Sequence, residues 1–356
     1  MSKTFDVVVL GGGAAGLMCA IEAGKRGRRV AVIERAEKIG KKILISGGGR
    51  CNFTNTHCTA DNFISANPHF AKSALARYTP RDFIGLVEKH GIPYHEKTLG
   101  QLFCDRAASD ITQMLEEECR AAGVQTFLSR RVTEISRTAE FVVRTDAEEF
   151  RAPVLVVATG GLSIPQIGAT SFGYEVARQF GVKIQKTRPA LVPLTFSAKE
   201  KKQYCDLAGV SMEVIARAGE CAFREKMLVT HGGLSGPAIL QASSYWEPGK
   251  PLTMDLAPDK NIAATVAAAR TRNAAVLRNA FVGILPKRFA DRWVELHEPD
   301  DWTNASLEKL EKLIHAWSVV PSGTEGYEKA EVTAGGVDTE ELSGKTMECN
   351  NVRGLF

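Results

Sequence analysis

Six residues near the N-terminus have the types and spacing of a dinucleotide-binding turn. The stretch Gly11-Gly12-Gly13-Ala14-Ala15-Gly16 follows the pattern G-x-G-x-x-G. In such a turn Gly11 permits a tight reversal, Gly13 lets the backbone approach a pyrophosphate, and Gly16 allows a helix to pack closely on a strand. The helix that begins there directs unpaired N–H groups and the positive end of its dipole at the phosphates. The pattern alone also occurs in plain strand-to-helix connections, so its context decides.

The neighbouring sequence supplies that context. Residues 5–10 (FDVVVL) and 30–33 (VAVI) are short apolar runs typical of buried parallel strands, and residues 14–25 between them are predicted to be helical. Glu34 ends the second strand, where a carboxylate accepts hydrogen bonds from ribose hydroxyls and repels a 2′-phosphate. The βαβ unit therefore predicts a bound dinucleotide, but it does not distinguish FAD from NAD.

Two further stretches favour FAD. Residues 40–52 (GKKILISGGGRCN) form a second glycine-rich loop, whose backbone can approach a flat ring and whose Lys41, Lys42 and Arg50 can neutralise phosphate or reduced flavin. The alternative is a flexible basic surface loop. Residues 154–161 (VLVVATGG) predict a buried strand that ends in Ala-Thr-Gly, as in FAD-dependent two-domain enzymes. A second G-x-G-x-x-G after a strand and a redox C-x-x-C are both missing, which argues against the pyridine-nucleotide disulfide reductases.

The catalytic residue is not identified by the sequence, and the candidates are His231 and Arg50. His231 lies in a glycine-rich turn, residues 230–237 (THGGLSGP), and is a candidate acid or base. The alternative is a backbone-bonding turn in which Ser235 caps a helix that has Pro237 at its first position. Cys51 follows a basic residue, so a lowered thiol pKa is one reading and packing against the cofactor is the other. Arg106 is a candidate fork for a substrate carboxylate, with a plain surface arginine as the alternative.

Hydrophobic periodicity gives the elements that must position these residues. Helices are predicted at 71–78, 80–90, 110–122, 261–279 and 306–317, the last with Asn304 as N-cap candidate. Strands are predicted at 131–135, 140–145, 154–158, 205–216, 220–223, 227–230 and 331–337. The expected fold class is α/β: a Rossmann-like FAD-binding domain with three layers and a parallel sheet, and an inserted β-rich plus helical domain. The expected boundaries are 1–190 and 331–356 for the first domain and 191–330 for the insert.

Composition limits the class of protein. The 356 residues are 44% hydrophobic and 24% charged, as in ordinary globular proteins. Lys plus Arg (45) barely exceeds Asp plus Glu (41), and the basic residues are scattered, so no nucleic-acid partner is expected. The eight cysteines show neither C-x-x-C pairing nor zinc-ligand spacing, which predicts reduced thiols and no metal site. The first apolar run is too short for a signal peptide or a membrane span, so a cytoplasmic protein without membrane contact is expected.

Four segments together resemble the BaiN/RdsA-like (YhiN-type) family of NAD(P)/FAD-dependent oxidoreductases. They are GGGAAGLMCA at 11–20, GKKILISGGGRCNFTN at 40–55, THGGLSGPAIL at 230–240 and VTAGGVDT at 332–339. The resemblance implies a bound FAD, a three-layer nucleotide domain and an inserted second domain. Members of the family continue beyond a Gly-Leu-aromatic strand into a segment that closes over the flavin. Because this sequence ends at Phe356, we expect it to lack that segment and to retain flavin more weakly.

These observations predict an oxidoreductase that transfers hydride through flavin N5. The expected electron donor is a transiently bound NAD(P)H, and the expected acceptor is a small organic substrate with an electron-poor double bond, or dioxygen. One alternative is a flavin-dependent oxidase of a small amine or amino acid that releases hydrogen peroxide; another is a non-catalytic flavin-bound interaction or RNA-modification partner. Substrate identity and oligomeric state are not predicted. The residues expected to contact the cofactor are Gly11, Gly13, Ala14, Ala15, Gly16, Glu34, Arg35, Lys41, Lys42, Gly48, Gly49, Arg50, Cys51, Asn52, Val132, Ala158, Thr159 and Gly160.

Overall fold

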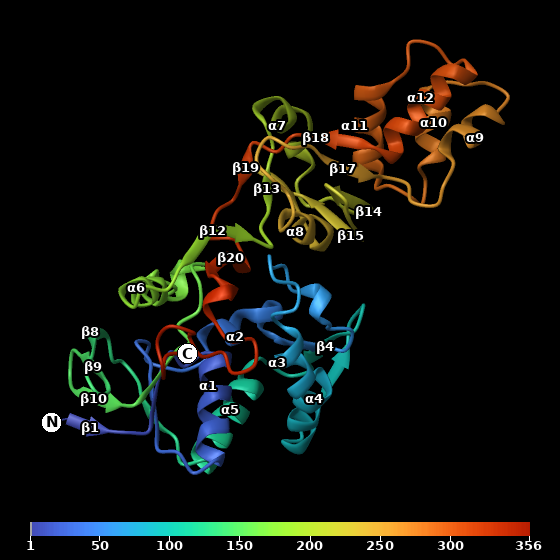
Figure 1. Ribbon diagram of the computed structural model, residues 1–356. Coiled ribbons are helices and arrows are strands. Elements are labelled where there is room, and N and C mark those ends of the chain that lie inside the picture. The colour runs from blue at the N-terminus through green and yellow to red at the C-terminus, as the bar shows by residue number, and fades with distance from the viewer. Residues whose placement is uncertain (1) are drawn as a thin grey trace. The chain divides into compact units, whose positions relative to one another are not determined.

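The computed structural model describes residues 2–356 and contains two compact units (Figure 1). Unit 1 consists of the chain up to Gly161 together with Gln166–Lys186 and Gly335–Phe356. Unit 2 consists of Leu162–Pro165 and Thr187–Ala334. The chain passes between the units in strands β12 (Ile184–Ala190) and β20 (Val332–Val337), which pair as a two-stranded sheet. The sequence placed the boundaries at 190 and 330 and did not anticipate the assignment of 162–165 to unit 2.

A parallel sheet forms the centre of unit 1. Its strand order is β11 (Val154–Val157), β2 (Val7–Leu10), β3 (Val30–Ile33) and β7 (Gln125–Phe127). All three pairings in this sheet are parallel. β2 and β3 are buried along their whole length, because residues on both faces of such a sheet are covered. The predicted Rossmann-like fold class is confirmed.

The parallel sheet lies between a helical layer and a second sheet. Helices α1 (Ala14–Lys25) and α5 (Ser109–Ala121) pack against each other, and Val7 and Val9 of β2 share a buried cluster with Ala20 of α1. The alternate residues Val8 and Leu10 pack instead with the second sheet. That sheet has the order β1 (Ser2–Thr4), β10 (Glu149–Ala152), β9 (Phe141–Thr145) and β8 (Val132–Arg137). Alternate side chains of β2 thus point to opposite faces of the parallel sheet, one towards the helices and one towards the second sheet, which makes three layers.

The remaining elements of unit 1 surround the sheet. A three-stranded sheet has the order β4 (Asn52–Asn55), β6 (Gln101–Cys104) and β5 (Tyr94–Glu96). The helices are α2 (Lys41–Ile45), α3 (Lys72–Arg77), α4 (Pro80–Lys89) and α6 (Phe172–Gln179). The last residues, Gly354 to Phe356, exchange backbone hydrogen bonds with Leu155 and Val157 at the edge of the parallel sheet.

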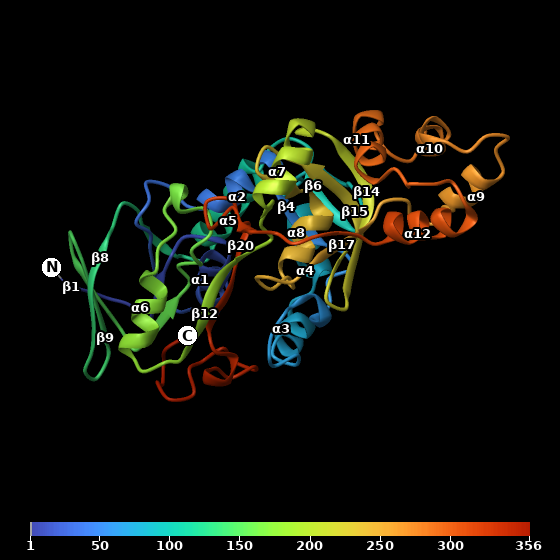
Figure 2. The same ribbon diagram turned by 90° about the horizontal axis from the view of Figure 1, so that it is seen from above.

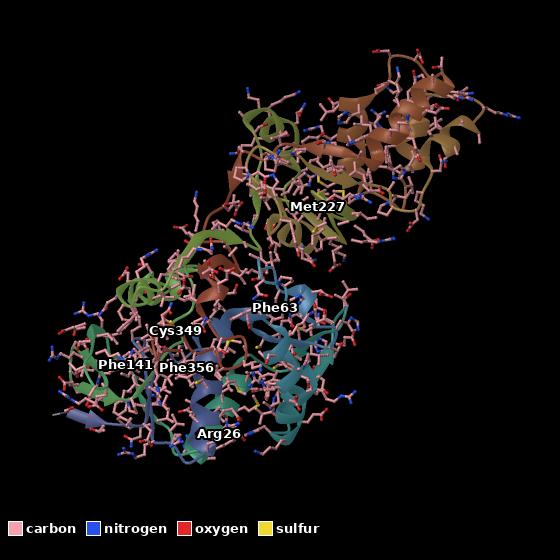
Figure 3. The ribbon with its side chains drawn as sticks, viewed as in Figure 1. Arg26, Phe63, Phe141, Met227, Cys349 and Phe356 are labelled. Atoms are coloured by element: carbon pink, nitrogen blue, oxygen red, sulfur yellow. The ribbon has the colours of Figure 1, made fainter. Side chains whose placement is uncertain are left out.

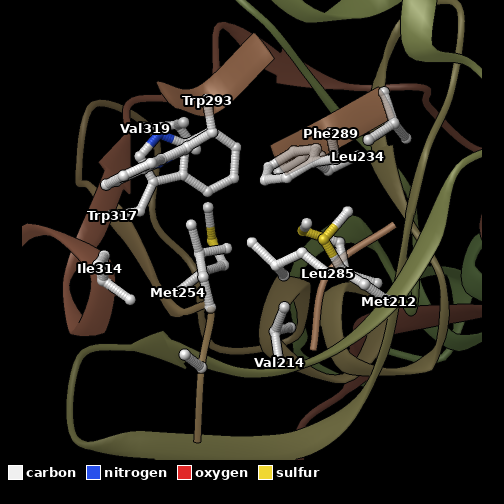
Figure 4. Close-up of a cluster of buried hydrophobic side chains, with 14 of the residues drawn as sticks. Met212, Val214, Leu234, Met254, Leu285, Phe289, Trp293, Ile314, Trp317 and Val319 are labelled. Carbon is white, nitrogen blue, oxygen red and sulfur yellow. The ribbon is translucent and has the colours of Figure 1, made fainter. Parts of the chain in front are cut away.

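Unit 2 is built on a seven-stranded antiparallel sheet. The order is β18 (Trp317–Val319), β17 (Leu252–Asp255), β14 (Ser211–Ala218), β15 (Cys221–Val229), β16 (Gly233–Ser235), β13 (Leu194–Thr195) and β19 (Gly323–Thr324). Helices α7 (Ala198–Tyr204), α8 (Pro237–Ser243), α9 (Ile262–Ala267), α10 (Ala274–Ala280), α11 (Lys287–His297) and α12 (Asn304–His315) complete the unit. Its core joins sheet and helices, with Met254, Phe289, Trp293 and Trp317 in one buried cluster (Figure 4).

Several predictions for unit 2 were wrong in detail. Residues 205–216 are not one strand, because Cys205–Leu207 is a 3-10 helix and β14 begins later. Residues 220–223 and 227–230 are parts of the single strand β15. The helix predicted at 261–279 is two helices, α9 and α10, since the Asn273 side chain accepts from Val276 N and starts a new helix. The N-cap of α12 is Thr303 rather than Asn304.

Each unit has its own apolar interior (Figure 3). Phe141 and Cys349 are buried in unit 1, and Met227 is buried in unit 2. Within residues 2–356, no helix is both long enough and apolar enough to cross a membrane.

Candidate functional site

The glycine turn lies at the carboxyl end of β2. The surroundings of Gly11, Gly13 and Gly16 differ, so each position excludes or permits a side chain for a different reason. Gly11 has φ +107°, and a Cβ added there would lie 2.5 Å from the carbonyl oxygen of Ala158. A Cβ on Gly16 would lie 2.0 Å from the carbonyl oxygen of Gly11, so this position fixes the close approach of helix to strand. At Gly13 φ is −88° and nothing lies within 4 Å of an added Cβ. The protein itself therefore permits a side chain at Gly13, and the space is open for a ligand.

Helix α1 begins directly behind this open space. Its N-cap residue Gly13 makes no side-chain cap hydrogen bond, and Ala14 and Ala15 are the first two helical residues. The first N–H groups of a helix have no partner within the helix and carry partial positive charge. The first turn of α1 holds no acidic residue that would compete for them. The arrangement therefore suits a pyrophosphate.

Glu34 follows β3 and faces the same turn. Its Oε2 accepts from Gly12 N at 2.7 Å, and its Oε1 accepts from Ala36 N at 2.8 Å. Each carboxylate oxygen keeps a further lone pair that can accept from a ribose hydroxyl. The carbonyl oxygen of Glu34 accepts from Arg130 N at 3.0 Å, and Val132 begins β8 two residues further on. Arg35 is exposed.

The second glycine-rich loop starts beside the first. Gly40 N donates to Gly12 O at 2.8 Å, so the main chain of Gly12 links Glu34 on one side and Gly40 on the other. The loop is more ordered than predicted: Lys41–Ile45 is helix α2, and the 3-10 helix Ser46–Gly49 follows it. Gly48 and Gly49 have φ +67° and +83°, and nothing lies within 4 Å of an added Cβ on either. These two residues can approach a ligand with bare backbone.

The rest of this loop is held by residues of β6 and the turn after it. Arg50 O accepts from Cys104 N at 2.9 Å, and Arg50 Nη1 donates to Asp105 O at 2.7 Å. Cys51 is buried and has φ +50°. Of the two readings of Cys51, the lowered thiol pKa is wrong: burial raises the pKa of this thiol, against a smaller opposing effect of the Ser46 hydrogen bond. The other reading, packing against the cofactor, stays a prediction.

Three further predicted residues belong to the same loop. With its amide turned so that the nitrogen faces them, the Asn52 side chain can donate to Thr54 O at 3.1 Å and Leu102 O at 3.2 Å at the start of β4. Lys41 forms an ion pair with Glu37, with 3.7 Å between Nζ and Oε1. Lys42 is exposed in the first turn of α2. Asn52 therefore holds the loop in shape, whereas the two lysines supply positive charge around it.

The end of β11 completes the arrangement. Ala158 N donates to Leu10 O at 2.9 Å, which places the Ala-Thr-Gly segment against the glycine turn. Gly160 has φ +77° and open space around an added Cβ. Thr159 lies against α6, since a Cβ on Gly173 would be 2.4 Å from Thr159 Oγ1. The sequence did not predict α6 or the hydrogen bond between Gly40 and Gly12. Gly173, near the start of α6, was the signal that could have indicated this helix.

The other candidates lie apart from this arrangement. His231 belongs to unit 2, is exposed, and makes no hydrogen bond or ion pair with any residue between 2 and 356. Its turn is held by Thr230 Oγ1, which accepts from Gly232 N and Gly233 N. The predicted cap by Ser235 is wrong, because Gly236 is the N-cap residue of α8 and has no side chain.

The first helical position of α8 is Pro237, as predicted. Arg106, the candidate fork for a substrate carboxylate, is 63% exposed and forms an ion pair with Asp110, 2.9 Å between Nε and Oδ2. Its guanidinium therefore has a structural partner one helical turn away.

Unit 1 thus brings together an anion-binding helix start, a carboxylate for ribose, and two stretches of bare glycine backbone at the carboxyl ends of β2, β3 and β11. Ligands of open α/β sheets bind at this edge. The residues fit an extended dinucleotide such as FAD, because the start of α1 suits a pyrophosphate, Glu34 can accept from a ribose, and no protein atom blocks the backbone of Gly13, Gly48, Gly49 or Gly160.

Comparison with known proteins adds the family. The family described as HI0933-like protein Rossmann domain matches residues 5–356. The chain belongs to the HI0933-like family. This membership confirms the predicted BaiN/RdsA-like group of flavoprotein oxidoreductases.

Three curated relatives of this HI0933-like protein span nearly the whole chain. A ribosomal RNA dihydrouridine synthase of Haemophilus influenzae is 44% identical over 100% of this chain and 92% of its own length. A ribosomal RNA dihydrouridine synthase of Escherichia coli is 45% identical over 99% of this chain and 90% of its own length. A 3-dehydro-bile acid delta(4,6)-reductase of Clostridium scindens is 29% identical over 98% of this chain and 90% of its own length.

Proposed function

We propose that this chain is an FAD-dependent reductase that converts a uridine of ribosomal RNA to dihydrouridine, with NAD(P)H as electron donor. The observation that carries the proposal is the 44–45% identity, over essentially the full chain, to two proteins named for that reaction. The third relative is named for reduction of carbon–carbon double bonds in a bile acid. A uridine C5–C6 bond and such an unsaturated ketone are both electron-poor double bonds conjugated to a carbonyl. The three names therefore share one type of chemistry.

The residues of unit 1 have definable roles in this proposal. The start of α1 binds the pyrophosphate, and Gly13 leaves room for it. Glu34 orients the adenosine ribose through its remaining lone pairs, while its hydrogen bonds to Gly12 N and Ala36 N hold the carboxylate still. The bare backbone of Gly48 and Gly49 would border the flat ring system of the cofactor. When bound and reduced by NAD(P)H, FAD would supply a hydride to one carbon of the substrate double bond, and the other carbon would take a proton from water.

This proposal departs from the expectation of a small organic substrate and no nucleic acid. An RNA substrate is favoured because the identity to the two RNA-modifying relatives is higher than the identity to the bile-acid reductase. It keeps the expected NAD(P)H donor and an electron-poor double bond as acceptor. The eight cysteines are all free thiols, which suits a reducing compartment, and the proposal therefore includes a cytoplasmic location.

The test is turnover under anaerobic conditions. The purified, FAD-loaded chain is mixed with in vitro transcribed ribosomal RNA and either NADH or NADPH, and nucleosides are analysed by mass spectrometry. We expect dihydrouridine to appear together with oxidation of one nicotinamide. Flavin reduction without dihydrouridine would reject the RNA substrate. Peroxide release in air with an amine or amino acid, without any nicotinamide, would support the oxidase alternative instead.

A further inference from the structure

One stretch of unit 2 departs from the even charge distribution of the whole chain. Between residues 260 and 290 the sequence holds six basic residues and no acidic one. They are Lys260, Arg270, Arg272, Arg278, Lys287 and Arg288. Counting charges over the full chain hides this asymmetry, because residues 291–311, which follow, hold seven acidic and two basic residues. A stretch of one sign is an interaction feature rather than a requirement of the fold.

The structure brings a second basic segment against this one. Helix α7 carries Lys199, Lys201 and Lys202, and its last residue, Tyr204, stacks on Phe289 of α11 with 6.1 Å between ring centroids; both helices are labelled in Figures 1 and 2. Arg288 Nη2 donates to Asp206 O at 2.8 Å, and Arg292 binds the Asp206 carboxylate at 2.8 Å. These contacts join two segments more than eighty residues apart in sequence. We call Lys199, Lys201, Lys202, Lys287 and Arg288 the α7–α11 basic face.

The cations of the α7–α11 basic face lack acidic partners. Within residues 2–356, no carboxylate lies within 4.0 Å of the charged group of any of the five. The carboxylates near them have other partners: Asp206 pairs with Arg292, and Glu200 accepts from Ser197 N in the cap of α7. All five side chains are on exposed residues. The charge is therefore available to an external anion.

Two of these cations occupy an unfavourable position in helix α11. Lys287 and Arg288 occupy the first turn of α11, which contains no acidic residue, and its N-cap residue Pro286 makes no side-chain cap hydrogen bond. Cations at the positive end of a helix dipole are unfavourable for stability. Residues that break a local rule without structural benefit are commonly functional.

We propose that the α7–α11 basic face binds the phosphate backbone of the ribosomal RNA substrate. This inference rests on the proposed function and names the surface by which the RNA is held. Five exposed cations on two neighbouring helices can contact successive phosphates, which supplies affinity and register without reading bases. The uridine chosen for reduction is then determined elsewhere.

The experiment measures binding as a function of salt. The FAD-loaded chain is titrated against in vitro transcribed ribosomal RNA between 50 and about 300 mM KCl. The slope of log K against log salt is negative, and each lost phosphate contact reduces its magnitude by about 0.7 to 0.9. The double variant Lys201→Gln/Lys202→Gln is therefore expected to reduce the magnitude of this slope by about 1.5. Its RNA affinity near 0.15 M KCl should fall roughly tenfold. Adding Lys287→Gln lowers both further.

The matched control is Lys309→Gln/Lys312→Gln on α12 of the same unit. These lysines are exposed but alternate with Glu308 and Glu311, so we expect less than a twofold change in affinity. Flavin content, Tm and the rate of flavin reduction by NAD(P)H should equal wild type in both variants. Equal loss of RNA affinity in both variants, or no loss in either, would overturn the proposal. Tight binding to an acidic peptide but not to RNA would also overturn it, in favour of a protein partner.

The same experiment separates the two proposals. If the wild type makes dihydrouridine but Lys201→Gln/Lys202→Gln binds RNA like the control, the function stands and the basic face is wrong. The opposite outcome is that the wild type binds RNA with the expected salt slope and the variant does not, yet the wild type never makes dihydrouridine. The α7–α11 basic face is then supported and the proposed reaction is rejected.

Discussion

The main-chain N–H of Gly12 donates to Glu34 Oε2 at 2.7 Å, which ties the phosphate turn after β2 to the carboxylate that follows β3. The other oxygen of Glu34 accepts from Ala36 N at 2.8 Å. The carboxylate is thus oriented before any ribose arrives, so little conformational freedom remains to be lost on binding.

Glu34→Gln tests this relationship. A glutamine keeps one carbonyl oxygen but turns an NH₂ group towards a backbone N–H, so one of the two hydrogen bonds is lost. We expect FAD occupancy to fall several-fold and the free energy of unfolding of the apo chain to fall by about 1 kcal/mol. Glu37→Gln, a side chain that is 76% exposed, is the control and should change neither quantity appreciably. Full FAD occupancy in Glu34→Gln would contradict a ribose-binding role.

Gly13→Ala and Gly16→Ala form a second test, because the two glycines differ in what surrounds them. Alanine at Gly13 meets no protein atom, so the apo chain should keep its Tm, while the added methyl group displaces the pyrophosphate and lowers FAD retention. Alanine at Gly16 collides with Gly11 O, and overpacking of this kind costs roughly 1–3 kcal/mol. Thermal unfolding and flavin absorbance of both variants check this. A normal flavin content in Gly13→Ala would rule out phosphate binding at α1.

Glu118 gives a prediction for stability against pH. This carboxylate is 4% exposed and contacts Lys25 and Lys89 at 2.7 and 2.6 Å and His90 Nε2 at 3.0 Å. Hydrogen bonds from Lys25, then Lys89 and His90, lower the pKa of Glu118 from 4.5 to about 2. Because the pKa is lower in the folded chain, the stabilisation, at most about 3 kcal/mol, is present above pH 4.5 and lost as pH falls towards 2.

Glu118→Gln should therefore lower Tm at pH 7, and the difference from wild type should shrink as the pH is taken below 4.5. Glu116→Gln, an exposed position on the same helix, is the control. A difference between Glu118→Gln and wild type that stays constant from pH 7 to pH 3 would show that packing, not charge, explains the loss.

His315 gives a prediction of opposite sign. Partial burial lowers its pKa, but hydrogen bonds to Asp255 at 2.8 Å and Glu311 at 3.1 Å outweigh that effect, and the net shift is upward. The folded-state pKa is raised, so the stabilisation is complete below the unfolded value of 6.5 and is lost as pH rises through the folded pKa. NMR titration of the ring should show the elevated pKa. Asp255→Asn should lower it towards the ordinary value, and no change in that variant would reject the pairing.

Local patterns were sufficient for the elements that carry the first half of the site. The apolar runs before Gly11 and Glu34 predicted β2 and β3, and α1 was predicted with the bounds that it has. These signals are short-range, since burial on both faces of a strand demands continuous apolar residues. The glycines themselves then indicated the dinucleotide.

What the sequence did not reveal depends on contacts between distant residues. The hydrogen bond from Gly40 to Gly12 and the packing of Gly173 on Thr159 follow from tertiary structure alone. The sequence left the pKa of Cys51 open between two readings, because a neighbouring arginine is visible in sequence, whereas burial, which raises this pKa, is not. The break between α9 and α10 was missed because alanines continue across it and Asn273 starts a new helix only where the chain turns.

The contact between Gly11 and Ala158 has a consequence for the order of biosynthesis. The glycine turn comes at the beginning of the chain, but the carbonyl group that packs against Gly11 belongs to Ala158, directly after β11. β11 is also the neighbour of β2 in the parallel sheet. A nascent chain that ends before Ala158 therefore presents the signature residues without the wall behind them. Cofactor capture then follows synthesis of β11, and translation-arrested chains that end before this strand should retain no FAD.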